Sequence, residues 1–248
     1  MMPSNMNNYF ALVKKQYKFK LKAYVSVFNS LIILQLLAIL FSFNPTSSRG
    51  FGGYGVDASL NNYSANISIV FTFLWGFITA FIITTKAYRE DDFTFVSNNQ
   101  SQGMANILYL LTISFIGGIT AILSGYLYHV MFYFTTNTSE IYTQTMTLTE
   151  LFIAIVATSL FILFCCALGY LAGILVQLHK IFGIILPVVF IGLLMFNGIS
   201  GGDSFLAKTF FFYFQEGNLV IFILKITITS SLLFLLSISL FRNKEARV

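Results

Sequence analysis

Long runs of apolar residues, separated by short polar segments, dominate the pattern of this chain. A helix needs about 20 apolar residues to cross a bilayer, because each residue rises about 1.5 Å through a hydrocarbon core of about 30 Å. Six runs meet or approach this length: 23–43, 67–85, 106–134, 151–178, 181–198 and 219–241. The pattern therefore predicts an all-α integral membrane protein, a single transmembrane domain (1–248) of six helices.

Details of the runs refine this prediction. The third and fourth are long enough to tilt or to project beyond the membrane. The fifth is short and carries Pro187, which is expected to kink it. The first lacks a small-residue cleavage site and is too long for the core of a signal peptide, so we expect it to be retained as a span.

Composition points to the same class. Hydrophobic residues make up 57% of the 248 residues and charged residues only 9%, against about 45–50% and about 25% in ordinary globular proteins. Polar side chains this scarce cannot cover a soluble surface, and the same numbers exclude intrinsic disorder. The two cysteines, Cys165 and Cys166, are neighbours in an apolar run and are interpreted as small apolar fillers.

The positions of lysine and arginine predict the orientation, because cytoplasmic loops carry an excess of both. With six spans, eleven of these residues fall on one side: Lys14, Lys15, Lys18, Lys20, Lys22, Lys86, Arg89, Lys180, Arg242, Lys244 and Arg247. Two residues, Arg49 and Lys208, fall on the other side. The asymmetry predicts a multi-pass membrane protein with both termini in the cytoplasm, and the family resemblance described below implies that the membrane is that of a bacterial cell.

The basic N-terminal segment has the pattern of an amphipathic helix, with one apolar arc at about 100° per residue and lysines along its flank. The arc consists of Phe10, Val13, Tyr17, Leu21 and Tyr24, and the flank of Lys14, Lys15, Lys18 and Lys22. One interpretation is a helix in the cytoplasmic interface whose lysines reach anionic lipid headgroups. The other is a plain positive-inside anchor. No nucleic acid is expected as a partner, because the lysines do not form a groove.

Motifs for catalysis and metal binding are absent from the sequence. No Gly-Lys dipeptide occurs, which excludes a phosphate-binding P-loop. His129 and His179 lie near opposite membrane faces, and neither His-Glu-x-x-His nor Cys-x-x-Cys occurs, so no metal ligand set is predicted. We expect no cofactor and no enzyme activity in this chain, and an intramembrane enzyme is the remaining alternative.

Lys225 is the one charged residue within a predicted span. A charge inside the bilayer is costly and marks a functional site by default. A lysine near the outer end of a span also has the length to snorkel to the headgroups, so both interpretations stay open. The spans contain no spaced series of Asp or Glu, which argues against a carrier driven by protons or sodium.

The outer connection between the fifth and sixth runs is aromatic, unlike the polar outer loops 44–66 and 135–149. It begins with Gly201-Gly202-Asp203-Ser204, which resembles a turn and a helix cap. Because it is too short to span and too aromatic for a free loop, it predicts an outer re-entrant or interfacial segment. The candidate outer-gate residues are Phe210, Phe211, Phe212 and Phe214. An aromatic anchor without a gating role is the alternative.

The cytoplasmic loop 86–105 combines a charged amphipathic segment with a polar turn over 97–103. Aromatic anchors beside charges that fix orientation are typical of a docking surface for a soluble partner. The candidate docking residues are Tyr88, Arg89, Glu90, Asp91, Asp92 and Phe93. A solvated connector is the alternative.

Small residues at every fourth position form two ridges, Gly117, Ala121 and Gly125 in the third run and Gly169 with Gly173 in the fourth. Such ridges allow helices to approach closely. The sequence leaves open whether they pack within the chain or between two chains.

The combined pattern resembles the six-helix permease subunits of type-two ABC exporters. The resemblance covers nearly the whole chain as architecture: a basic amphipathic N-terminal helix, six spans, a charged loop after the second span and an outer segment between the last two. Lys86-Ala-Tyr-Arg-Glu, followed by Phe95-Val-Ser-Asn-Asn-Gln-Ser and a long apolar run, resembles the coupling-helix region of that family.

The resemblance implies a function and its partners. Such a permease pairs with a second permease chain, identical or homologous, and two separate ABC ATPase subunits dock below the pair. Small phenylalanine-rich permeases of this kind resemble those that export amphipathic peptides such as phenol-soluble modulins and bacteriocins. The expected function is therefore ATP-driven export of amphipathic or antimicrobial-type peptides, with residues 88–93 coupling the chain to the ATPase. The alternative is a self-contained channel or scaffold without an ATPase partner.

Overall fold

The computed structural model describes residues 6–43, 47–53, 56–62, 66–85, 88, 99–135, 146–199, 208–209, 212–213 and 216–245. Within these residues the long elements are seven helices, with one two-stranded hairpin between the second and the third. The helices are α1 (Met6–Ala23), α2 (Ser26–Ser42), α3 (Asn66–Ile83), α5 (Asn99–Thr135), α6 (Leu148–Leu178), α7 (Phe182–Ile199) and α9 (Leu219–Glu245), and the strands are β1 (Ser47–Gly53) and β2 (Val56–Asn62).

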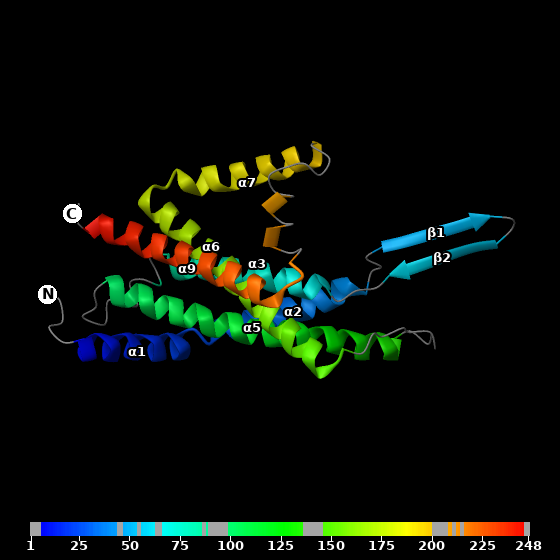
Figure 1. Cartoon of the computed structure of the whole chain (residues 1–248), viewed down its shortest axis with the longest axis horizontal. Helices are drawn as coiled ribbons and strands as arrows, with labels where there is room; N and C mark the ends of the chain where they lie inside the picture. The colour runs from blue at the N-terminus through cyan, green and yellow to red at the C-terminus, as the bar shows by residue number, and fades with distance from the viewer. Residues whose placement is uncertain are drawn as a thin grey trace.

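The helices run back and forth along the long axis of the molecule (Figure 1). Helices α2, α3, α5, α6 and α9 form the bundle, in which α6 packs against α3, α5 and α9. Helix α7 stands apart from the bundle and contacts it near the end of α6. The start of α1 and the end of α9 lie at one end of the bundle, and the hairpin projects from the other end.

Four helices are long and apolar enough to cross a membrane by themselves: α3, α5, α6 and α9. Helix α2 reaches this standard only together with α1, and the pair is bent by 50°. The apolar part of α7 over Phe182–Leu193 falls short of it. The described residues thus contain four candidate spans, or five if the bent pair is counted as one.

The outer surface of the bundle is that of a membrane protein. Large apolar side chains are exposed on every long helix of the bundle, for example Leu36, Leu74, Leu123 and Leu236. Soluble monomers rarely expose continuous apolar surface on this scale. The chain is therefore a multi-pass membrane protein, and its all-helical class is confirmed for the long elements.

Glycine sets the close crossing of α3 and α6. A Cβ on Gly169 would overlap the carbonyl oxygen of Phe77 and lie 2.9 Å from its carbonyl carbon, and one on Gly173 would overlap Oγ1 of Thr84. In the third run, Gly117 faces Trp75 at 3.5 Å. The sequence left open whether the glycine ridges pack within one chain or between two chains. These three glycines pack within the chain.

Hydrogen bonds between polar side chains also join the helices inside the bundle. Gln35 of α2 donates to Oγ1 of Thr72 at 3.2 Å and of Thr120 at 3.0 Å. Ser68 and Ser124 share a bond of 2.5 Å. Because lipid offers no alternative partner, such bonds between spans stabilise their register, by about 0.6 kcal/mol each on average.

Two segments differ from the sequence prediction. Helix α5 begins at Asn99, so the end of the predicted loop 86–105 is helical. Its polar residues Ser101 and Gln102 are buried against the bundle, and this packing favours a helix over a solvated turn. The predicted outer loop 44–66 contains the antiparallel hairpin, in which Ser47 pairs with Asn62 and Gly53 with Val56.

The six-span orientation predicts a definite labelling pattern. In a chain without its native cysteines, a cysteine at Ser59 or Ser139 is expected to react with a membrane-impermeant maleimide added outside sealed cells. A cysteine at Ser97 or Asn243 is expected to react only after the membrane is permeabilised. Reaction of the Ser97 site in sealed cells would show that the orientation is wrong.

Candidate functional site

The structure describes three of the predicted site residues: Tyr88, Phe212 and Lys225. The others lie outside the described residues, namely Arg89, Glu90, Asp91, Asp92, Phe93, Phe210, Phe211 and Phe214. The three described residues fall into two separate clusters, one before α9 and one at the junction of α1 and α2.

Lys225 holds the segment that precedes α9. Its ammonium group forms an ion pair with the carboxylate of Glu216 and donates to the backbone oxygen of Phe212 at 3.1 Å. The same group lies 3.7 Å from the centre of the Phe212 ring, where an ammonium is attracted by the face of the ring. Lys225 therefore has its partners within the chain, and snorkelling to headgroups is not needed to stabilise its charge.

Aromatic contacts tie the same segment to α6. The ring of Tyr213 lies 5.2 Å from that of Phe164, and on the next turns Phe161 lies 5.1 Å from Phe222 of α9. We call Phe212, Tyr213, Glu216 and Lys225 the outer clamp, after the side of the membrane that the sequence predicts for them. It joins the segment to α9 by the ion pair of Lys225 and to α6 by the ring contact of Tyr213.

Tyr88 lies near the start of the predicted cytoplasmic loop 86–105, and its ring packs against the bundle. It lies 4.8 Å from the ring of Tyr24, whose hydroxyl donates to the Tyr88 carbonyl oxygen at 3.4 Å. Tyr24 also contacts the ring of Tyr109, 6.0 Å away on α5, and Tyr109 is fully buried. We call Tyr24, Tyr88 and Tyr109 the tyrosine cluster. It connects the start of the loop to the α1–α2 junction and to α5.

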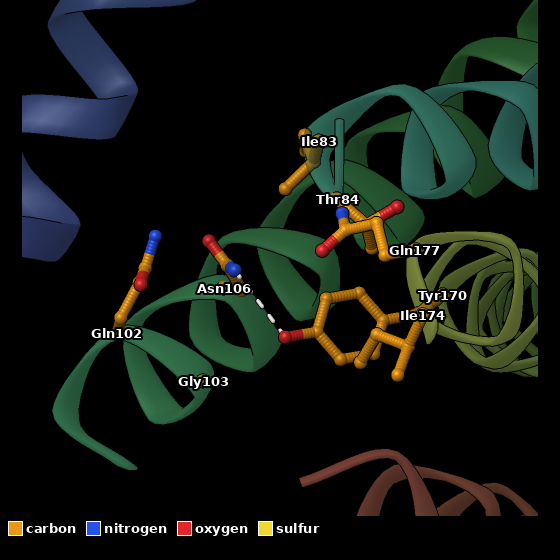
Figure 2. A pocket seen from close by; sticks show the side chains of 8 residues that line it. All are labelled: Ile83, Thr84, Gln102, Gly103, Asn106, Tyr170, Ile174 and Gln177. Atoms are coloured by element: carbon orange, nitrogen blue, oxygen red, sulfur yellow. Dashed lines mark hydrogen bonds between the residues drawn. The ribbon is translucent and has the colours of Figure 1, made fainter. Parts of the chain in front are cut away.

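A small cavity with polar and apolar lining residues lies beside the end of α3, between α5 and α6 (Figure 2). It is lined by Ile83, Thr84, Gln102, Gly103, Asn106, Tyr170, Ile174 and Gln177. Asn106 donates to the Tyr170 hydroxyl at 3.3 Å, while its own carbonyl oxygen is buried without a partner. The space open to the centre of a water molecule is about 20 Å³, and a buried water needs about 10–15 Å³ by this measure. The cavity therefore has room for a water beside an unpaired acceptor.

Sequence reasoning missed the partners in these clusters. Glu216 was not singled out, although it stands nine residues before Lys225 and is acidic in a largely apolar region. Tyr109 and Asn106 were treated as ordinary residues of a span. Polar side chains near the predicted end of a span were the available signal. Their contacts depend on how α5 packs on its neighbours and on how the segment before α9 lies against that helix.

The described residues contain no group of three or more His, Cys, Asp or Glu side chains that could hold a metal ion. Comparison of the chain with protein-family models, with curated proteins and with solved structures finds no match. Its function must therefore be inferred from its own residues.

Proposed function

We propose that this protein is the permease subunit of an ATP-driven ABC exporter that moves amphipathic or antimicrobial-type peptides out of a bacterial cell. The chain crosses the membrane six times with both termini in the cytoplasm, and it pairs with a second permease chain. ATP is hydrolysed on a separate ABC ATPase subunit, which docks on residues 88–93. The outer clamp and the neighbouring phenylalanines hold the exit segment, which is the predicted outer connection between α7 and α9.

The tyrosine cluster is the observation that carries this proposal. A soluble ATPase moves membrane helices only through a rigid contact, and Tyr88 contacts Tyr24 at the junction of α1 and α2 by its ring and by a hydrogen bond. Displacement of the loop is then transmitted to the α1–α2 junction and, through Tyr24 and Tyr109, to α5. The alternating direction of α2, α3, α5, α6, α7 and α9 supports six passes (Figure 1), and the missing P-loop suits an ATPase on another chain.

Charge reversal of the loop tests the docking. Replacing Glu90, Asp91 and Asp92 with Lys is expected to weaken complex formation with the ATPase, and more strongly at low salt, because the partner's charges then repel the loop. Replacing Phe93 with Ala is expected to cost about 2 kcal/mol of binding if its ring fills a pocket of the partner. Co-purification from native membranes and substrate-stimulated ATP hydrolysis measure both effects.

A matched control is the same change of charge in the predicted outer loops, with Asp57, Glu140 and Asp203 replaced by Lys. It is expected to leave the complex intact. A self-contained channel or scaffold predicts that no ATPase co-purifies with any of these variants or with the unaltered chain. Normal co-purification and normal hydrolysis in both loop variants would remove residues 88–93 from the mechanism.

A further inference from the structure

Helix α1 packs a half-polar face against the bundle. Four residues at spacings of three and four are buried on that face: Val13 (4% exposed), Gln16 (1%), Lys20 (1%) and Tyr24 (5%). Helix α5 is the main neighbour of α1, and the Tyr17 hydroxyl bonds to Oγ1 of Thr112 at 2.8 Å. The interpretation of α1 as a helix that only lies in the interface is therefore incomplete, because its docked face belongs to the fold.

Gln16 makes this docking costly. Both atoms of its side-chain amide, Nε2 and Oε1, are buried without a hydrogen-bond partner. A buried unpaired polar group destabilises the state that buries it, whereas an apolar side chain of the same size does not. A helix made to stay on α5 permanently would carry such an apolar residue here. Undocking exposes the amide to water or headgroups and removes the penalty.

The solvent-facing flank of α1 fits an anionic surface. Lys14, Lys18 and Lys22 recur at every fourth residue and are exposed. The segment Met6–Ala23 contains no acidic residue, and Phe10 is 61% exposed at its start. Lysines beside an exposed aromatic ring are the features by which interfacial helices bind anionic lipid. Because α2 begins three residues after α1 ends, the helix is held close to the headgroups.

The joint between α1 and α2 has the geometry of a hinge. The two helices meet at 50°, and the hydrogen bonds across the joint include Val27 N to Tyr24 O at 3.1 Å and Phe28 N to Val25 O at 3.0 Å. These are three-residue bonds of the 3₁₀ type, which within a helical run often mark a hinge. No side chain caps the start of α2 at Val25, so the angle at the joint depends on the contacts that α1 and Tyr24 make with the bundle.

We propose that α1 is a movable arm that exchanges between a docked position on α5 and a released position on anionic lipid headgroups. Neutral bilayers favour the docked arm, and anionic bilayers favour the released arm, in which Gln16 and Lys20 join the basic flank. The exchange requires only that α1 lies at the membrane surface. It therefore does not depend on the exporter function or on which side of the membrane α1 occupies.

Distance measurements on the full-length chain test the exchange. Nitroxide labels are placed on cysteines at Ala11 of α1 and Leu108 of α5, both exposed, in a chain without native cysteines. The chain is compared in nanodiscs of phosphatidylcholine and of phosphatidylcholine with phosphatidylglycerol. We expect one distance population in neutral lipid and a second, longer one in anionic lipid. The neutral sample also reports whether each variant folds with α1 docked.

Two variants separate the causes. Gln16→Leu is expected to shift the ratio of docked to released arm about tenfold toward docked, because the unpaired amide is gone. Replacing Lys14, Lys18 and Lys22 with Gln is expected to abolish the longer population in anionic lipid and leave the neutral sample unchanged. Identical distances in the two lipids would overturn the proposal. So would a longer population that survives the lysine changes, or one that appears only when a soluble protein partner is added.

Discussion

Replacing Gly169 with leucine is expected to destabilise the protein strongly. At this position a Cβ overlaps the carbonyl oxygen of Phe77, which is backbone and cannot rotate away. Helices α3 and α6 must therefore separate, and forced overpacking costs about 3 kcal/mol. A loss of this size lowers the melting temperature by about 10 °C in a chain of this length. Thermal unfolding of the purified chain in detergent, followed by circular dichroism, measures it.

Gly192 provides the matched control, because nothing lies within 4 Å of a Cβ built there on α7. The gain in helix propensity from glycine to leucine is the same at both sites and cancels in the comparison. We expect Gly192→Leu to unfold at or above the temperature of the unaltered chain. Equal melting temperatures for the two variants would contradict the close crossing of α3 and α6.

The helices themselves were predictable from the sequence because a membrane span requires a long run of apolar residues. The runs at 67–85, 106–134, 151–178 and 219–241 correspond to α3, α5, α6 and α9, and the N-terminal amphipathic segment corresponds to α1. The six-span topology and the outer re-entrant segment stay predictions. Periodicity does not determine the angle between α1 and α2, since that angle depends on how α1 packs on α5.

The partners of the functional residues were less predictable, since each is set by tertiary packing. The sequence singled out Lys225 as an unusual charge, but its ion pair with Glu216 requires the segment before α9 to fold back on the helix. It counted Lys20 among the cytoplasmic lysines, and the structure buries that side chain. Tyr88 was predicted to face a partner, whereas its described contacts are with Tyr24.

Reversing the charge of Lys225 is expected to open the outer clamp. A glutamate at this position faces Glu216 and removes both the bond to the Phe212 backbone and the ring contact. Breaking an ion pair that is largely shielded from water leaves a charge without compensation, at a cost of about 2 kcal/mol or more. This corresponds to about a 30-fold larger population of the open segment. The labelling rate of a cysteine at Tyr213 by an impermeant maleimide is expected to rise by the same factor.

Exchange of the two charges distinguishes the ion pair from a general effect of mutation. The double variant Lys225→Glu with Glu216→Lys restores opposite charges and is expected to recover most of the slow labelling. Lys208→Glu, a reversal at a second lysine in the predicted outer region, is expected to leave the rate unchanged. If Lys225 only snorkels to the headgroups, the maleimide is expected to label a cysteine at Tyr213 at the original rate in both the Lys225→Met and the Lys225→Glu variant.

The clamp also has a predicted consequence for transport, which rests on the proposed exporter function. Tyr213 and Lys225 hold the exit segment against α6 and α9, so a freed segment no longer closes the path between cycles. In the assembled complex, Lys225→Glu is expected to keep ATP hydrolysis near its normal rate while peptide export per ATP falls by up to about 30-fold, the factor by which the open population rises. Export measured in vesicles alongside phosphate release gives this ratio directly. A proportional loss of hydrolysis and export, at normal protein abundance, would instead assign the clamp to assembly of the complex.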